Sequence, residues 1–77
     1  MLLESLRRKQ IELSEIDEKF APRLGMSRQN WGFLRKGKIT FSAPVLGSVL
    51  VTFPDLKNEV DIFLLENASV NAKKASN

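Results

Sequence analysis

The sequence predicts an all-α fold, a compact bundle of about five helices. Apolar residues recur at three- and four-residue spacings along most of the chain, which is the period of one helix face. Residues that cap or end helices separate these stretches, among them Gly25, Gly37 and Pro54. The length of 77 residues allows one domain. We therefore expect a helical domain over residues 1–66 and a polar tail over residues 67–77, either disordered or an arm that orders on a partner.

The first two helices are predicted from their apolar faces. A helix from residue 2 to about residue 11 would bury one face and expose its basic residues. Ser14 and Asp17 have the spacing of a capping pair for the second helix. The residues expected on the buried faces share helical spacing: Leu2, Leu3, Leu6 and Gln10 in the first helix, and Ile16, Phe20 and Leu24 in the second.

Residues 20–38 predict two short helices that meet across a tight turn. Gly25 comes directly after the first of these helices, at the position where a helix end commonly needs a left-handed residue. Ser27 can then cap the next helix by accepting a backbone N–H, and Gly37 ends that helix. Pro22 is unusual, because proline inside a helix forfeits a hydrogen bond at a cost of about 3 kcal/mol. The helix before the turn is therefore expected to start late or to kink.

The helix between Ser27 and Gly37 has two unlike faces. Trp31 and Leu34 lie at helical spacing, which favours core packing of the tryptophan over stacking on a nucleic-acid base. The opposite face presents Gln29, Gly32, Phe33 and Lys36, with Arg28 projecting from the first turn. We expect this outer face to contact a partner.

The next helix would begin at Ser42, with Pro44 in the first turn, where a missing N–H costs little. Gly47 inside it is expected to let a neighbouring backbone approach closely, because an idle helical glycine costs about 1 kcal/mol relative to alanine. Ile39 and Phe41 in the preceding loop can close over the core. The residues expected on the buried face are Val45, Leu46, Val49, Leu50 and Phe53.

Pro54 ends that helix, and Asp55 can cap a fifth. The fifth helix would bury the apolar residues of one side, namely Leu56, Val60, Phe63 and Leu64. Ile62 and Leu65 point elsewhere, and Val51 lies on the outer face of the preceding helix. These three residues predict an uncovered apolar patch, and we expect a symmetric dimer to cover it.

Composition limits the possible functions. The chain contains no cysteine, which excludes disulfides and thiolate metal sites, and no histidine, the commonest general base. We therefore do not expect an enzyme, a metal or a cofactor. No apolar run approaches the roughly 18 residues of a membrane span, so the expected location is the cytoplasm, without membrane contact.

The net charge of +3 is unevenly distributed. Residues 1–18 carry three basic and five acidic side chains, a net charge of −2. Residues 19–54 carry six basic side chains and no acidic one, a net charge of +6. A charge run is often only a solvated face, but here it coincides with the helix pair and favours contact with phosphate.

The helix pair resembles the helix-turn-helix of the lambda repressor and Cro family. The likeness rests on Ala21 near the start of the first helix, Leu24-Gly25 at the turn, Ser27 after one spacer, Trp31 four residues later, and Gly37-Lys38. The surrounding helices fit the family's five-helix domain over about residues 1–66. The resemblance implies a small Cro-like repressor or autoregulator of phage or bacterial origin, which binds a palindromic double-stranded DNA operator as a dimer and needs no small-molecule ligand.

The resemblance also implies residue roles. The residues that open the recognition helix of this family read bases, and here they are Arg28, suited to guanine, and Gln29, suited to adenine. Phe33 is either a thymine-methyl contact or a partly exposed packing residue, and Gly32 would allow close approach to the groove. The residues expected to hold phosphates are Ser27, Asn30, Arg35, Lys36 and Lys38. The family's phosphate-binding glutamine in the preceding helix is not matched, because Asp17 lies near that position.

Two other functions remain open. The domain could be a protein-interaction module, such as an antitoxin or an adaptor, that binds a protein through Phe33, Ile62 and Leu65. RNA binding is a third possibility, but the chain lacks the exposed aromatic platform of single-strand readers. Salt dependence distinguishes DNA binding from protein binding, because phosphate contacts weaken steeply as salt rises.

Overall fold

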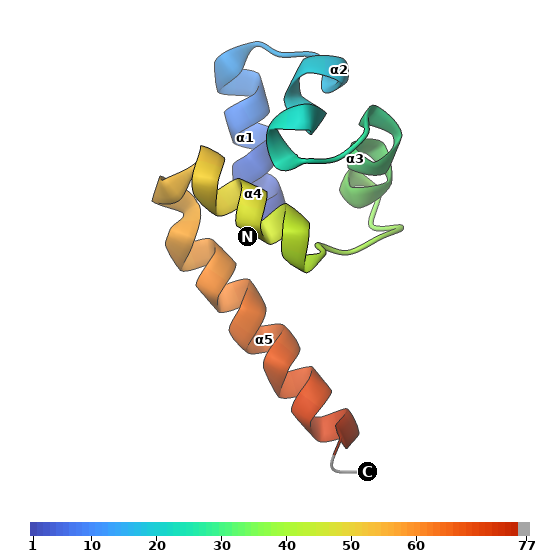
Figure 1. The fold of residues 1–77 in the computed structure, drawn as a ribbon, viewed down its shortest axis with the longest axis vertical. Helices are drawn as coiled ribbons and strands as arrows, with labels where there is room; N and C mark the ends of the chain where they lie inside the picture. The colour runs from blue at the N-terminus through green and yellow to red at the C-terminus, as the bar shows by residue number, and fades with distance from the viewer. Residues whose placement is uncertain (76–77) are drawn as a thin grey trace.

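Helices make up all the regular structure of residues 1–75, the part of the backbone that the computed structural model describes; side chains are described for residues 1–67. In chain order they are α1 (Leu2–Leu13), α2 (Asp17–Phe20), the 3-10 turn η1 (Ala21–Leu24), α3 (Arg28–Arg35), α4 (Ala43–Thr52), the 3-10 turn η2 (Pro54–Leu56) and α5 (Lys57–Ala75). The predicted all-α class and the five helices are confirmed. Elements α1 to α4 form a compact body, and α5 extends away from it (Figure 1).

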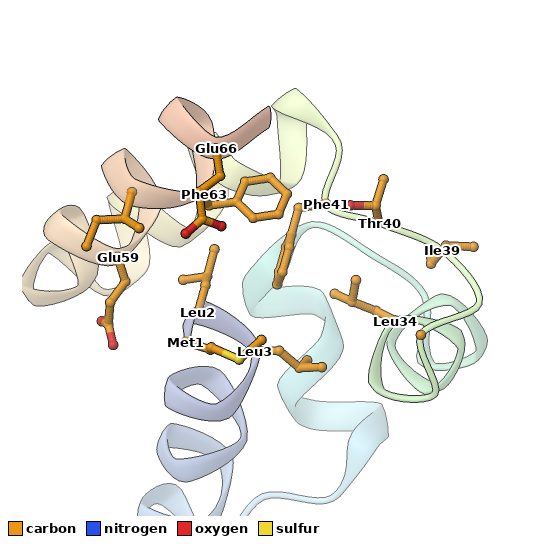
Figure 2. Close-up of a pocket in the computed structure, with 12 residues that line it drawn as sticks. Met1, Leu2, Leu3, Leu34, Ile39, Thr40, Phe41, Glu59, Phe63 and Glu66 are labelled. Carbon is orange, nitrogen blue, oxygen red and sulfur yellow. The ribbon is translucent and has the colours of Figure 1, made fainter. Parts of the chain in front are cut away.

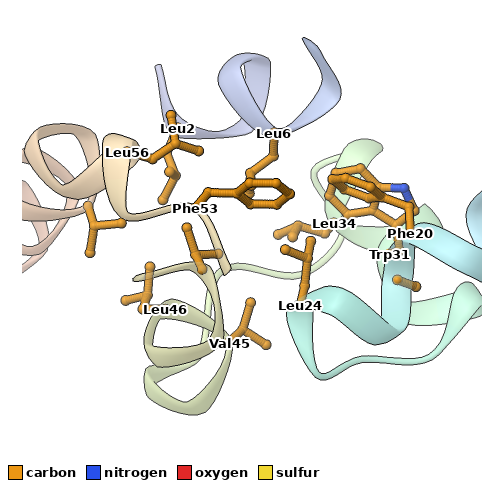
Figure 3. Close-up of a cluster of buried hydrophobic side chains, with 13 residues drawn as sticks. Leu2, Leu6, Phe20, Leu24, Trp31, Leu34, Val45, Leu46, Phe53 and Leu56 are labelled. Carbon is orange, nitrogen blue, oxygen red and sulfur yellow. The ribbon is translucent and has the colours of Figure 1, made fainter. Parts of the chain in front are cut away.

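The core lies where α1, α2, α3 and α4 meet (Figure 3). Trp31 is fully buried, as predicted, and its ring centroid lies 5.2 Å from that of Phe20. The Phe20 ring also stacks on Phe53, at 6.0 Å. One aromatic cluster thus joins α2, α3 and the end of α4. The buried apolar residues are Leu2, Leu6, Phe20, Ala21, Leu24, Trp31, Leu34, Val45, Leu46, Val49, Phe53, Leu56 and Val60.

Both predicted glycine turns are confirmed. Gly25 and Gly37 have left-handed φ angles of 69° and 75°. Each follows a helix end in the same pattern, in which two successive backbone N–H groups return to carbonyls of the last turn. At Gly37 these bonds run from Gly37 to Leu34 and from Lys38 to Phe33. The turn before α3 and the loop after it are therefore set by local backbone geometry.

The expected capping role of Ser14 is wrong. Helix α1 runs on to Leu13, and Ser14 ends it in a left-handed conformation with φ 53°. Its backbone N–H donates to the Ile11 carbonyl, so Ser14 belongs to the helix that precedes it. Helix α2 instead begins after Ile16, without a side-chain cap. Ile16, expected in the core, is 63% exposed, because it stands outside α2 at its open end.

Pro22 shortens the second helix. Helix α2 ends at Phe20, and the chain tightens into the 3-10 turn η1, with Pro22 in the first positions of that turn. A proline there loses no hydrogen bond, because the first N–H groups of a helical turn have no partner within it. The helix is therefore cut short at the proline, and neither a late start nor a kink in a continuous helix is needed.

Helix α4 follows the prediction in its cap and its buried face, except at one glycine. The Ser42 hydroxyl accepts the Val45 backbone N–H at 3.4 Å. The close approach expected at Gly47 is wrong, because a Cβ there would meet no atom within 4 Å. The close approach instead occurs one residue on, where Ser48 Oγ would lie 2.8 Å from a Cβ on Gly25. Helix α4 thus packs against the Gly25 turn through Ser48.

The start of α5 is anchored to the body, and the helix then leaves it. Asp55 was expected to cap the helix but lies inside η2, where its carboxylate binds Lys9 Nζ at 2.6 Å. Val60 is buried, and the Ser5 hydroxyl donates to the Glu59 carboxylate. Leu64, expected in the core, is 47% exposed, whereas its neighbour Phe63 is partly buried and packs against the core.

The end of α5 bears on the predicted tail. Its backbone continues to Ala75, past the expected domain end at residue 66. Residues 76–77 and the side chains from residue 68 onward lie outside the described part. The polar tail over residues 67–77 therefore stays a prediction. Over residues 1–75, no helix has both the length and the apolar character of a membrane span.

Candidate nucleic-acid interface

The outer face of α3 forms a shallow polar depression. Its lining contains every residue expected on that face, together with one acidic residue from α2: Asp17, Arg28, Gln29, Gly32, Phe33 and Lys36. The opposite side of the same helix carries the buried Trp31 and Leu34. Helix α3 is therefore fixed by its inner face, which leaves its outer face open.

The N-terminus of α3 is capped as predicted. Ser27 Oγ accepts the backbone N–H of Asn30 at 3.1 Å, which satisfies one of the free donors of the first turn. Ser27, Asn30 and Gln29 are all exposed at this end of the helix. The cap thus presents the first turn of α3, with its candidate base-reading and phosphate-binding residues, at the protein surface.

Arg28 has a partner within the chain. Its Nη1 atom lies 2.8 Å from Glu18 Oε1, and the two side chains are 66% and 63% exposed. An ion pair at this exposure contributes only about 0–1 kcal/mol, because water and salt screen it. Arg28 is therefore held in position near the depression, yet can exchange its partner at little cost.

Arg35 is bound more closely to the body than the other candidate phosphate-binding residues. Its Nη2 atom donates to Asp17 Oδ2 at 2.7 Å, and its guanidinium lies 5.5 Å from the centroid of the Trp31 ring. Lys36 and Lys38 are exposed, and Lys38 Nζ lies 5.8 Å from the centroid of the Phe33 ring. The two lysines thus have more freedom than Arg35 to meet an external anion.

The sequence did not reveal how the acidic start of α2 is used. Asp17 was expected to pair with Ser14 at a helix cap, and Glu18 was counted only for its charge, yet they hold Arg35 and Arg28 across the two helices. No spacing rule would have found these pairs, because their members are 10 and 18 positions apart. Part of the positive charge of residues 19–54 is therefore already neutralised by carboxylates of the same chain.

A third ion pair links the loop after α1 to the segment before α3. Arg23 Nε and Nη2 donate to the two carboxylate oxygens of Glu15 at 2.6 and 2.8 Å. These hydrogen bonds lower the pKa of Glu15 and raise the pKa of Arg23. The Thr52 hydroxyl also donates to the Arg23 carbonyl at 2.9 Å. The loop after α1, the turn η1 and the end of α4 are thereby tied together.

The candidate dimer residues are exposed, as predicted. Val51 is 85% exposed and Leu65 is 70% exposed, and Ile62 is also exposed. Ile62 and Leu65 are three positions apart on α5, so they are neighbours on one face of that helix. Val51 comes from α4, near the η2 turn that leads into α5. The dimer itself stays a prediction.

A separate apolar hollow of about 370 Å³ lies between the start of α1, the loop after α3 and the first half of α5 (Figure 2). Leu34 and Phe41 line one side, and Leu2 and Phe63 line the other. The Phe41 and Phe63 rings meet edge to face at 5.2 Å. Phe41 therefore closes over the core as expected, whereas Ile39 stays exposed at the edge of the hollow.

No protein-family model, curated protein or solved structure matches this chain.

Proposed function

We propose that the protein is a small sequence-specific regulator that binds double-stranded DNA, a repressor or autoregulator of the Cro type, with α2, η1 and α3 as its helix-turn-helix. The observation that carries the proposal is the outer face of α3, where Arg28, Gln29, Gly32, Phe33 and Lys36 surround one depression. This face belongs to a segment, residues 19–54, with six basic residues and no acidic one. A basic segment that contains an exposed helix with base-matching side chains fits the major groove of DNA.

In this proposal Arg28 leaves Glu18 and donates to guanine, and Gln29 pairs with adenine. Both side chains start in the exposed first turn of α3, at the edge of the depression. Phe33 adds apolar contact to a thymine methyl where the site offers one. The carboxylate of Glu18 is only a weak competitor for Arg28, because the ion pair is solvent-exposed.

Gly32 supports the proposal because its lack of a side chain is not explained by packing within the protein. A Cβ on Gly32 would meet only the end of the Arg35 side chain, at 3.9 Å. Packing within the protein therefore does not require glycine, although glycine in mid-helix costs about 1 kcal/mol relative to alanine. Close approach of a DNA groove to the helix backbone would account for it.

The proposed complex is a symmetric dimer on a palindromic site, with Ile62 and Leu65 of the two copies in contact. Its two recognition helices would lie about 34 Å apart, one turn of DNA. Lys36 and Lys38 would hold the phosphates that flank each groove, together with Ser27 and Asn30 at the opposite end of α3. The tie to Asp17 gives Arg35 a smaller part in this contact.

The test is selection of bound sites from a random duplex pool, followed by titration of the selected and a random duplex at two salt concentrations. We expect a symmetric consensus and an affinity that falls steeply as salt rises. Lys38→Ala should weaken both duplexes alike and reduce the salt slope by about one. The proposal fails if no consensus emerges and if duplex affinity does not depend on salt.

A second candidate function is favoured by the exposed apolar residues of α5 and the neighbouring hollow. An antitoxin or adaptor could use Ile62, Leu65 and the hollow to bind a protein. Such an apolar contact would be nearly insensitive to salt. The same two-salt titration therefore separates the two functions.

A further inference from the structure

Gln10 connects three helices behind the candidate interface. Its side-chain oxygen accepts the indole N–H of Trp31 at 3.1 Å. Its side-chain nitrogen donates to Asp17 Oδ1 at 2.8 Å and to the Glu15 carbonyl at 3.1 Å. The one amide thus reaches from α1 to α3, to the start of α2 and to the loop between α1 and α2.

These contacts close into a ring. Asp17 binds Gln10 through one carboxylate oxygen and Arg35 through the other. Arg35 lies one helical turn after Trp31 on α3, and its guanidinium is 5.5 Å from the centroid of the indole ring. The ring therefore runs from Gln10 to Trp31, Arg35 and Asp17 and back to Gln10. It fixes α3 against the start of α2 next to the depression, which Asp17 also lines.

The amide of Gln10 matches the hydrogen-bonding needs of its three partners. The buried indole is a donor and needs an acceptor, whereas the Asp17 carboxylate and the Glu15 carbonyl need donors. Glutamine supplies both kinds of group from one side chain. A buried donor left without a partner costs free energy, so a substitution at Gln10 should change how Trp31 and α3 are seated.

We propose that Gln10 is a positioning residue for DNA recognition: through Trp31 and Asp17 it sets the angle between α3 and α2, and thereby where Arg28 and Gln29 point. The proposal rests on the DNA-binding function proposed above. Gln10 itself lies on α1, outside the residues that line the depression. Its effect on base reading is therefore indirect.

The first measurement follows hydrogen exchange of the Trp31 indole proton in the full chain. The chain has one tryptophan, so a single indole resonance reports on this bond. Gln10→Met keeps the length but removes both hydrogen-bonding groups, and indole exchange should rise about tenfold relative to the Val49 backbone amide in α4. Ile11→Met is the matched control, because Ile11 is the next residue of α1 and is exposed. That control should leave indole exchange unchanged.

The second measurement compares duplex binding by the same variants. Gln10→Met should lose about tenfold in affinity for the selected duplex and less than about twofold for random duplex, because phosphate contacts tolerate a tilted helix better than base contacts do. Gln10→Glu keeps an acceptor for the indole but places a second carboxylate beside Asp17. It should lose more affinity for the selected duplex than Gln10→Met while keeping more indole protection.

The outcomes separate the two proposals. If both Gln10 variants change the exchange of the indole and of the Val49 amide by the same factor relative to the parent, Gln10 is a general stabilising residue and the inference is overturned. An equal loss of affinity on selected and random duplex would overturn it as well. If the parent protein binds no duplex, the proposed function fails. The exchange data then still decide whether the Gln10 amide fixes the position of α3 through Trp31.

Discussion

Helices α3 and α5 differ in how fully their apolar side chains and their ends are covered within a single chain. Helix α3 has only eight residues, but its inner side chains are buried, its first turn is capped by Ser27, and Gly37 closes its end. Helix α5 has 19 residues, yet it contacts the body mainly through its first turns and leaves Ile62 and Leu65 exposed. The short helix is capped at both ends and exposes only its outer face. The long helix exposes an apolar surface that a second copy of the chain could cover.

The largest effect is expected at the inner face of α3. Trp31→Ala should cost about 3–5 kcal/mol, because it removes the largest fully buried side chain and leaves a cavity. A domain of this size has net stability of only about 3–5 kcal/mol, so the variant should be largely unfolded. Urea titration followed by circular dichroism measures this. Phe33→Ala, on the outer face of α3, should cost much less, and equal losses would contradict the difference between the two faces.

The next effect concerns the exposed face of α5. Ile62→Glu combined with Leu65→Glu should cost at least about 2 kcal/mol of dimer association, because it places charges in the centre of the proposed contact. Sedimentation should show monomer at concentrations where the parent is a dimer, with weaker binding to a palindromic duplex. Asn58→Glu, an exposed site near the start of α5, is the control. Unchanged sedimentation of the double variant would rule out this interface.

The outer face of α3 should affect sequence choice without affecting folding. Gln29→Ala should lose about 1–3 kcal/mol of discrimination at one or two positions of each half-site. Its affinity for random duplex and its urea midpoint should stay at the parent values, because Gln29 is exposed. Titration of single-base variants of the selected duplex measures the loss. A uniform loss across all variants would make Gln29 a residue that positions the protein on the backbone.

The cap of α3 should have a smaller effect on stability. Ser27→Ala removes the acceptor for the Asn30 N–H and should cost about 1 kcal/mol in the absence of DNA. Ser42→Ala, the equivalent change at α4, should cost no more, since its hydrogen bond is longer, at 3.4 Å. The comparison uses urea midpoints of the two variants. A loss at Ser42 but none at Ser27 would show that packing of Trp31 alone holds α3.

The smallest effect is a pH dependence at the base of α5. The hydrogen bond from Lys9 lowers the pKa of Asp55, and the same contact raises the pKa of Lys9. A carboxyl whose pKa is lower in the folded protein stabilises it above the unfolded-state pKa, and that contribution is lost as pH falls through the folded-state pKa. Asp55→Asn should therefore flatten the decline of the urea midpoint below about pH 4. The decline that remains should include the contribution of Glu15, whose pKa is lowered by Arg23.

The local features of α3 and α4 were predictable from short stretches of sequence. Gly25, Ser27 and Gly37 act within a few residues of their own positions, so their roles follow from backbone sterics and hydrogen-bonding capacity. The outer face of α3 could be derived in the same way, from helical spacing around Trp31 and Leu34. Ser14 misled the prediction because serine also fits the left-handed end of α1, and local rules do not choose between two compatible roles.

The sequence by itself determined the helical class, the turns on either side of α3 and the residues that its outer face presents, because each depends on neighbours within one or two turns. Only the tertiary structure decided that Arg28 and Arg35 are held by Glu18 and Asp17 and that Gln10 seats Trp31. It also decided that Leu64 is exposed while Phe63 packs against the core, since this depends on how α5 lies against the body. These contacts join residues that are distant in the sequence, and only packing brings them together.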